Sequence, residues 1–253
     1  MLELLTVTCA SLLAGFVDAI VGGGGLILVP ALFGAFPAAA PATLFGTNKG
    51  AAVWGTAWAG LQYARRVQLP WQALGPAAVA ALAGAGAGAW TVTQLPSDLL
   101  RRALPLVLLG LLVYTLARKD LGREHAPRFH GRAEALRAAL IGAGIGFYDG
   151  FFGPGTGSFF VFLLVRWLGY DFLHASACAK LLNTATNLSA LGLFAWAGHV
   201  WWQVALVMAV ANVAGSLLGT RLALRHGAGF VRGAFIAVVA LLILKTGSDA
   251  FLR

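Results

Sequence analysis

Residues 15–25 read GFVDAIVGGGG, and residues 146–157 read GFYDGFFGPGTG. The two stretches match at an offset of 131 residues, and a lysine follows each aspartate by 31 residues: Lys49 follows Asp18, and Lys180 follows Asp149. Internal repeats that each carry a glycine-rich interruption of a hydrophobic segment are typical of secondary membrane transporters. The doubled pattern therefore predicts a membrane transporter and not a soluble enzyme.

The composition indicates a protein that lives in a lipid bilayer. Hydrophobic residues make up 59% of the 253 positions, charged residues only 11%, and the mean hydropathy is +0.81, whereas soluble domains carry about 25% charged residues. The net charge of +9 comes from arginines in the short gaps between apolar runs. This is the positive-inside pattern of membrane proteins, so we expect no nucleic-acid partner.

Eight apolar segments predict an all-α polytopic fold made of two repeats. They span residues 4–36 (interrupted by glycines), 44–63, 74–95, 103–117, 138–165 (interrupted), 175–197, 202–222 and 231–252. Each repeat thus holds one broken segment followed by three transmembrane helices. We expect the first repeat over residues 1–117, a basic cytoplasmic connecting loop over 118–137, and the second repeat over 138–253.

The interrupted segments either cross the membrane or fold back as re-entrant hairpins, and the choice decides how the repeats are related. With two hairpins, twelve basic residues lie on the cytoplasmic side and four outside; with eight crossings, the numbers are ten and six. The positive-inside rule favours the hairpins, and hence inverted repeats, while eight crossings stay an alternative.

The glycine-rich breaks are candidate anion-binding backbone. Non-helical backbone at membrane depth survives only where protein buries it or a cavity solvates it, and a helix that restarts after a break points its positive dipole end at that place. The alternative is that the glycines only permit a turn or close helix packing. The break residues that we assign to a substrate site are Gly23, Gly24, Gly25, Gly155, Thr156 and Gly157.

Lys49 and Lys180 are the other candidates for the substrate site. A lysine near the centre of a transmembrane helix costs about 2.5 to 3.5 kcal/mol on insertion scales, so a function or a partner usually holds it there. Both lysines lie near the start of their apolar runs, and snorkelling to the membrane interface is the rival interpretation. Polar neighbours argue against it and suit an oxyanion, and we assign to the site Thr47, Asn48, Asn183 and Asn187.

Asp18 and Asp149 have three open interpretations: counter-ions of the lysines, carriers of a coupling proton, or caps for backbone groups freed at the breaks. A polar stripe on a later segment, made by Asn212, Ser216 and Thr220, is interpreted as interhelical hydrogen bonding. The spacings of Gly84 with Gly88 and of Gly215 with Gly219 indicate close helix packing.

No catalytic constellation, nucleotide-binding loop or metal-ligand cluster is evident in the sequence, so we expect no enzymatic activity, no cofactor and no metal site. The two cysteines, Cys9 and Cys178, lie in apolar stretches and are interpreted as small packing residues.

The paired motifs, residues 15–25 with Gly46-Thr47-Asn48-Lys49 and residues 146–157 with Ala179-Lys180-Leu181-Leu182-Asn183, resemble those of the TauE/SafE sulfite exporter family. The resemblance covers essentially the whole chain. It implies an integral inner-membrane permease for small sulfur-containing anions such as sulfite, sulfoacetate or other organosulfonates. It leaves open the substrate, the direction of movement and whether the protein forms a homo-oligomer.

Three functional hypotheses follow. The leading one is a secondary transporter of a small anion, in which the anion binds near the membrane midplane between the two breaks. A proton or a sodium ion is the candidate coupling ion. The alternative is a channel or cation-coupled permease of unrelated specificity that relies on Asp18 and Asp149. A third, non-transport reading is a membrane-embedded assembly partner in which the repeats serve only packing.

Overall fold

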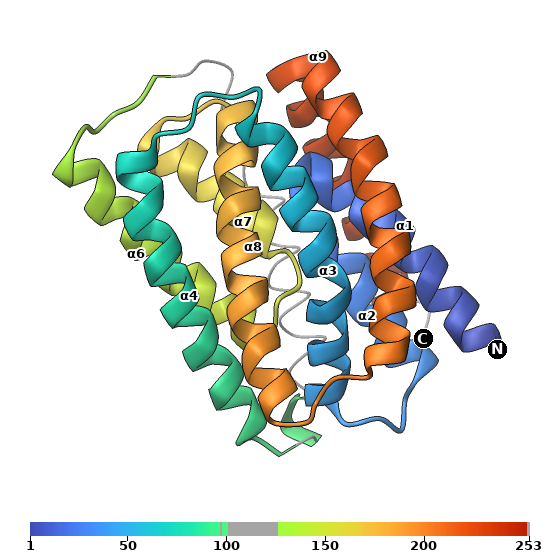
Figure 1. The fold of residues 1–253 in the computed structure, drawn as a ribbon. Coiled ribbons are helices and arrows are strands. Elements are labelled where there is room, and N and C mark those ends of the chain that lie inside the picture. Colours follow the sequence, from blue (N-terminus) through green and yellow to red (C-terminus); the bar gives the residue numbers. More distant parts are fainter. Residues whose placement is uncertain (97, 101–125, 252–253) are drawn as a thin grey trace.

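The computed structural model describes residues 1–96, 98–100 and 126–251, and every regular element in these ranges is helical (Figure 1). The predicted all-helical class is confirmed. The elements are α1 (Leu2–Val21), α2 (Gly25–Ala35), α3 (Pro41–Ala64), α4 (Trp71–Thr93), α6 (Arg132–Phe151), α7 (Thr156–Leu163), the π-helical η1 (Leu164–Leu168), α8 (Phe172–Trp196) and α9 (Trp202–Phe251). The apolar segment expected over 103–117 and most of the expected connecting loop lie outside the described residues.

Three of these helices are long and apolar enough to cross a membrane: α1, α4 and the part of α9 over Trp202–Gly227. The apolar pieces α2 and Thr156–Leu168 are shorter. Helices α3 and α8 are long as well, with 24 and 25 residues, but they carry Lys49, Lys180 and several amide side chains. Buried polar side chains are thus numerous on these two helices.

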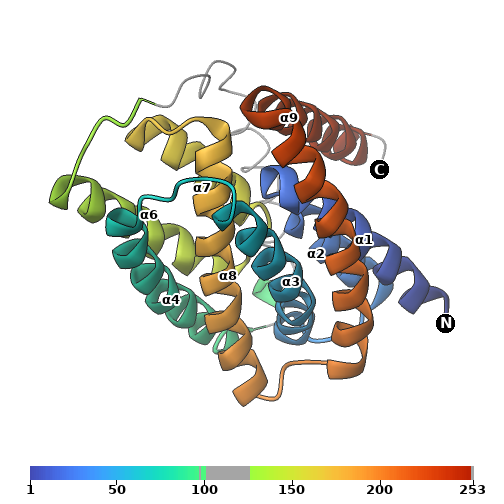
Figure 2. The same ribbon diagram turned by 45° about the horizontal axis from the view of Figure 1, so that its top comes forward.

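Helices α3 and α8 lie side by side in the middle of the bundle (Figures 1 and 2). Helices α4 and α6 pack together on one side of them, and α1 and α9 pack together on the other. The short helix α2 turns back along α1, and α7 turns back from α6. The interrupted segments therefore bring their turns toward the central pair of helices.

Small residues set the spacing of the two outer helix pairs. A Cβ atom added at Gly84 or Gly88 of α4 would overlap the backbone of α6, and one added at Gly215 or Gly219 of α9 would overlap the backbone of α1. The close packing predicted from these glycine spacings is confirmed. Without a hydrophobic driving force in lipid, such close approach is a main source of helix association.

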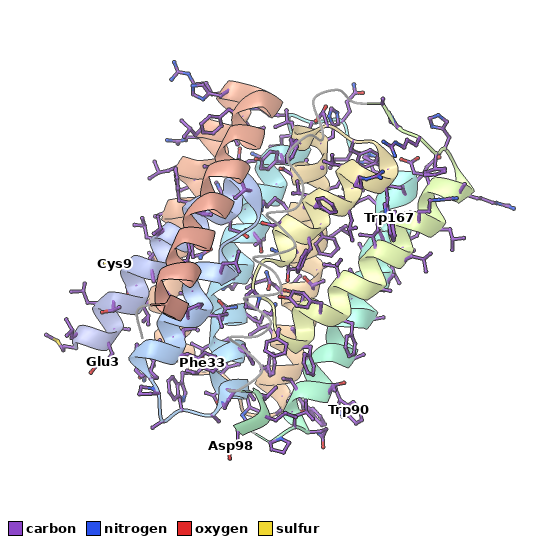
Figure 3. All side chains as sticks on the ribbon, turned by 180° about the vertical axis from the view of Figure 1, so that it is seen from behind. Glu3, Cys9, Phe33, Trp90, Asp98 and Trp167 are labelled. Carbon is purple, nitrogen blue, oxygen red and sulfur yellow. The ribbon has the colours of Figure 1, made fainter. Side chains whose placement is uncertain are left out.

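The outer surface is apolar and carries exposed tryptophans toward its two ends. Trp90 of α4 is 57% exposed and Trp167 of η1 is 50% exposed, and they project from opposite ends of the molecule (Figure 3). Tryptophan is enriched at both membrane–water interfaces. This surface fits a protein that is surrounded by lipid, with one interface near each end.

The stretch labelled α9 consists of two helices that meet at Gly227, where the backbone leaves the helical conformation (φ 73°, ψ −165°). This division agrees with the two separate segments predicted over 202–222 and 231–252. One boundary differs from the sequence prediction: helix α6 begins at Arg132, six residues before the expected start of the second repeat, because its first turn is polar and does not belong to the apolar run. This difference does not alter the placement of the glycine-rich breaks.

Candidate functional site

Both glycine-rich stretches break a helix through backbone conformations that favour glycine. Helix α1 ends at Val21 and is followed by Gly22, whose φ is 82°, and α2 begins at Gly25. In the second stretch, φ is 88° at Gly153 and 79° at Gly155, and α7 begins at the next residue. A residue with a Cβ atom rarely adopts these left-handed backbone angles. The glycines in the sequence therefore determine where the two turns form.

The two breaks meet in space. The backbone N–H of Ser158 donates to the carbonyl oxygen of Gly22 at 2.9 Å, and the Ser158 hydroxyl donates to the carbonyl oxygen of Val21 at 3.1 Å. A Cβ atom at either Gly22 or Gly157 would overlap the backbone of the other. One free N–H group at the start of α7 is therefore satisfied by the other break.

Lys49 lies in the middle of this arrangement. It projects from α3, is only 1% exposed, and its Nζ lies 2.6 Å from Oδ2 of Asp149 on α6. The other oxygen of that carboxylate, Oδ1, accepts a hydrogen bond from the Thr156 hydroxyl at 2.6 Å. Asp149 thus ties the ammonium group to the first residue of α7.

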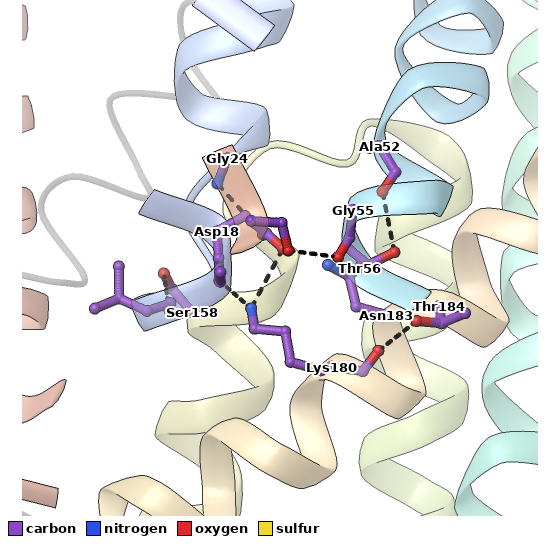
Figure 4. Close-up of polar contacts among 12 residues, drawn as sticks. Asp18, Gly24, Ala52, Gly55, Thr56, Ser158, Lys180, Asn183 and Thr184 are labelled. Atoms are coloured by element: carbon purple, nitrogen blue, oxygen red, sulfur yellow. Dashed lines mark hydrogen bonds and ion pairs between the residues drawn. The ribbon is translucent and has the colours of Figure 1, made fainter. Parts of the chain in front are cut away.

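Lys180 forms the equivalent arrangement with the first glycine-rich break. It projects from α8, is fully buried, and its Nζ lies 3.3 Å from Oδ2 of Asp18 (Figure 4). The ammonium group also donates to the backbone carbonyl of Asp18, and Oδ1 of that aspartate accepts from the N–H of Gly24 at 3.4 Å. Both lysine side chains are buried inside the protein and paired there with a carboxylate, so the snorkelling interpretation is wrong.

The two ion pairs are crossed between the halves of the chain. Lys49 of the first half pairs with Asp149 of the second, and Lys180 of the second half pairs with Asp18 of the first. Two ammonium and two carboxylate groups give this centre a formal charge of zero. A buried ion pair repays the cost of desolvation only with good geometry and further hydrogen bonds, and each carboxylate here accepts one from the neighbouring break.

A cavity of about 30 Å³ lies between the breaks and the central helices. Lys49 and both aspartates line it, together with backbone of both breaks. Helices α3, α8 and α9 contribute neutral polar side chains to the lining: Asn48, Thr56, Asn183, Asn187 and Asn212. Asn48 is only 4% exposed, and its Oδ1 has no hydrogen-bond partner among the described residues.

Most of the site residues predicted from the sequence line this cavity, and four do not: Lys180, Gly23, Gly155 and Thr47. Lys180 is held against Asp18, which is itself part of the lining. Besides the charged and neutral polar residues already described, the lining includes Gly24, Gly25, Thr156 and Gly157. Gly23 and Gly155 lie within the turns themselves. Thr47 lies elsewhere, where its hydroxyl oxygen accepts from the N–H of Trp201 at 3.1 Å, so it supports the connection between α8 and α9.

Two polar residues of the lining, Thr56 and Asn212, were not assigned to the site from the sequence. Thr56 lies two helical turns after Lys49, and its hydroxyl oxygen accepts from Asn187 Nδ2 at 3.5 Å. Asn212 forms the expected interhelical bond, to the carbonyl oxygen of Ser11 at 3.1 Å, but also faces the cavity. The spacing of seven residues places Thr56 on the same face of α3 as Lys49, and this is the signal for Thr56 that the sequence contains.

A polar, charge-balanced centre enclosed by helices with a lipid-facing exterior is the architecture of a membrane transporter. Comparison with known proteins gives the same class. The family model described as "Sulfite exporter TauE/SafE" matches residues 7–246. The chain therefore belongs to the TauE/SafE family.

Curated relatives agree over nearly the whole chain. "Probable membrane transporter protein YfcA" of Escherichia coli (strain K12) is 39% identical over 243 residues, which is 95% of this chain and 88% of that protein. "Probable membrane transporter protein ORF9" of Sinorhizobium sp is 36% identical, over 95% and 90%. A "Probable membrane transporter protein" of Haemophilus influenzae is 32% identical, over 95% and 93%. No solved structure matches the chain.

Proposed function

We propose that the protein is a secondary transporter of small sulfur-containing anions, such as sulfite or organosulfonates, in the inner membrane, and that the anion binds between the two glycine-rich breaks. The observation that carries this proposal is the burial of Lys49 and Lys180 beside those breaks, next to a cavity rich in amide side chains. Amide N–H and ammonium groups are the donors that a sulfonate or sulfite oxygen accepts from.

The proposal includes two inverted repeats, each opened by a re-entrant hairpin. Equivalent contacts occur twice with the partners exchanged: Gly15 approaches the carbonyl of Asn212, and Gly146 approaches that of Ala81. Each residue of the second contact is related to one of the first by the 131-residue offset of the sequence repeat. Exchange of partners between halves is what a pseudo-two-fold axis produces, and the direction of the hairpins indicates whether that axis lies in the membrane plane.

The hairpins also open toward opposite ends of the molecule (Figure 1). Helix α2 leads to α3 at the end where α8 connects to α9, whereas η1 leads to α8 at the end where α3 connects to α4. The segments at this second end carry the basic residues Arg65, Arg66, Arg128, Arg132 and Arg166. By the positive-inside rule this end faces the cytoplasm.

The alternative of a cation site built on Asp18 and Asp149 is less well supported. Each carboxylate already has a lysine ammonium group as its counter-ion. A metal cation would have to displace that lysine into a low-dielectric interior, which is costly. A current that requires a cation and no anion would favour this alternative.

Binding is tested by thermal unfolding of the purified protein with sulfite, sulfoacetate and methanesulfonate. An anion that binds only the folded protein, at one hundred times its dissociation constant, stabilises it by about 2.7 kcal/mol. The shift in melting temperature should vanish in the charge-neutral variant K49M/D149N. It should persist in the matched control Arg221→Met, which removes one exposed cation from α9. Equal stabilisation of K49M/D149N would remove Lys49 from the binding site.

A further inference from the structure

The crossed ion pairs occupy the two ammonium groups that an anion would need in order to bind at the centre. Lys49 Nζ is 2.6 Å from the Asp149 carboxylate, and Lys180 Nζ is 3.3 Å from that of Asp18. Both ammonium groups are therefore already neutralised by the protein. An incoming anion adds uncompensated negative charge to a centre whose formal charge is zero.

Space and repulsion both work against binding beside intact ion pairs. The cavity of about 30 Å³ holds one or two water molecules and not a sulfonate. An anion that reaches Lys49 also comes within a few ångströms of the Asp149 carboxylate, and like charges at this separation in a low dielectric repel strongly. The anion and the carboxylate thus compete for the same ammonium group.

We propose that protons resolve this competition: the transporter is a proton–anion symporter in which Asp18 and Asp149 take up the coupling protons. This inference rests on the proposed function. One proton neutralises each carboxylate, breaks its ion pair and releases that lysine to the anion. A divalent anion with two protons then leaves the centre with no net charge, and both protons leave with the anion on the other side.

Few other groups near the centre can titrate. Lysines come from α3 and α8, and the aspartates from α1 and α6. Two phenols lie close: Tyr63 of α3 donates to the carbonyl of Ala19 at 3.0 Å, and Tyr148 of α6 donates to that of Pro154 at 2.6 Å. Helices α2, α4 and α7 contain no charged residue, and α9 faces the cavity with Asn212. Among the described residues near the centre, the two aspartates are thus the carboxylates that can take up a proton.

The test uses the whole protein in liposomes that contain a pH-sensitive dye, with radiolabelled sulfoacetate, a dianion at neutral pH, outside. Wild type should acidify the interior as sulfoacetate enters, with about two protons per anion, and uptake should be little affected by an imposed membrane potential. An inward proton gradient should accelerate uptake severalfold.

Asp18→Asn and Asp149→Asn imitate the protonated acids. Each should still bind and move sulfoacetate down its own gradient, with about one proton fewer per anion and a weaker dependence on pH. The matched control Asp98→Asn changes an exposed aspartate and should behave as wild type. The wild-type proton count and voltage response need no variant, so they decide the question even where an asparagine variant fails to fold.

The outcomes separate the two proposals. Proton coupling is overturned if sulfoacetate enters without acidifying the interior, or if its entry strictly requires sodium ions instead of protons. Either result leaves the proposed function standing. No binding and no entry of any sulfur-containing anion overturns the proposed function, and the symport inference with it.

Discussion

The backbone N–H of Ser158 donates to the carbonyl oxygen of Gly22 at 2.9 Å, and this bond joins the two interrupted helices at their turns. Each break thereby satisfies backbone groups of the other, which in lipid would otherwise cost several kcal/mol each. The same closeness holds the first residues of α2 and α7 against one cavity. The breaks are therefore a structural unit as well as a candidate binding surface.

Gly22→Ala should destabilise the protein by more than about 2 kcal/mol. The left-handed backbone at this position costs a non-glycine residue about 1 to 2 kcal/mol, and the added methyl group would also overlap the backbone of Gly157. Thermal unfolding in detergent measures the effect. Gly34→Ala is the matched control, because nothing lies within 4 Å of its Cβ position; equal melting temperatures for the two variants would contradict the packing of the breaks.

The Lys49–Asp149 pair should show strong coupling in a double-mutant cycle. Lys49→Met alone leaves a buried, uncompensated carboxylate and should cost about 3 to 5 kcal/mol of stability. The double variant K49M/D149N removes both charges and should recover most of that loss. Unfolding free energies of the two single variants and the double variant give the coupling. Losses that simply add would mean that the two groups are not paired in the membrane.

Labelling of single cysteines should show that the two ends of the molecule lie on opposite sides of the membrane. In a background in which Cys9 and Cys178 are replaced by alanine, Ala38→Cys and Ala197→Cys should react with a membrane-impermeant maleimide added to intact cells. Gln68→Cys should react only after the cells are opened, because it lies in the connection beside Arg65 and Arg66. Labelling of Gln68→Cys in intact cells would contradict the proposed orientation.

The hydrogen bond between Tyr170 and Glu134 should give a pH-dependent contribution to stability. Tyr170 lies between η1 and α8, and its hydroxyl donates to Glu134 Oε1 at 2.5 Å. Burial, and then this bond, raise the pKa of Tyr170. The contribution is therefore present in full below the unfolded-state value, near pH 10, and is lost as the pH rises further.

Tyr170→Phe should consequently be less stable than wild type at pH 7, by about 1.5 to 3 kcal/mol for a bond to a charged acceptor. The difference should shrink above about pH 10, where the unfolded wild-type chain begins to gain a charge. Melting curves of both proteins at pH 7, 9 and 10.5 measure it. A difference that stays constant across this range would contradict the assigned bond.

The sequence was sufficient to predict the helical membrane class and to single out the lysines, the aspartates and the breaks. It could not predict that the ion pairs cross, because Asp18 has the same spacing to Lys49 as Asp149 has to Lys180, and pairing within each half fits the sequence equally well. Only the side-chain geometry decides between the two pairings, because Lys49 Nζ lies 2.6 Å from Asp149 Oδ2 and Lys180 Nζ lies 3.3 Å from Asp18 Oδ2.

Other differences between prediction and structure follow from helix geometry. Thr47 precedes Lys49 by two residues, which is about 200° around a helix, so it points away from the cavity. Asn212 was assigned to interhelical bonding alone, yet one amide both bonds Ser11 and lines the cavity. Side chains at a crowded crossing of three helices can serve both roles, and spacing along one helix does not reveal this.

The central claim, that the buried lysines bind the transported anion, is tested most directly by sulfoacetate flux into liposomes that hold Asp149→Asn or K49M/D149N. Both variants lack the carboxylate, and they differ only in the ammonium group. We expect that Asp149→Asn moves sulfoacetate down its gradient and that K49M/D149N does not, with the same contrast between Asp18→Asn and K180M/D18N. Equal flux through the two members of either pair, in protein that is folded and inserted, would contradict it.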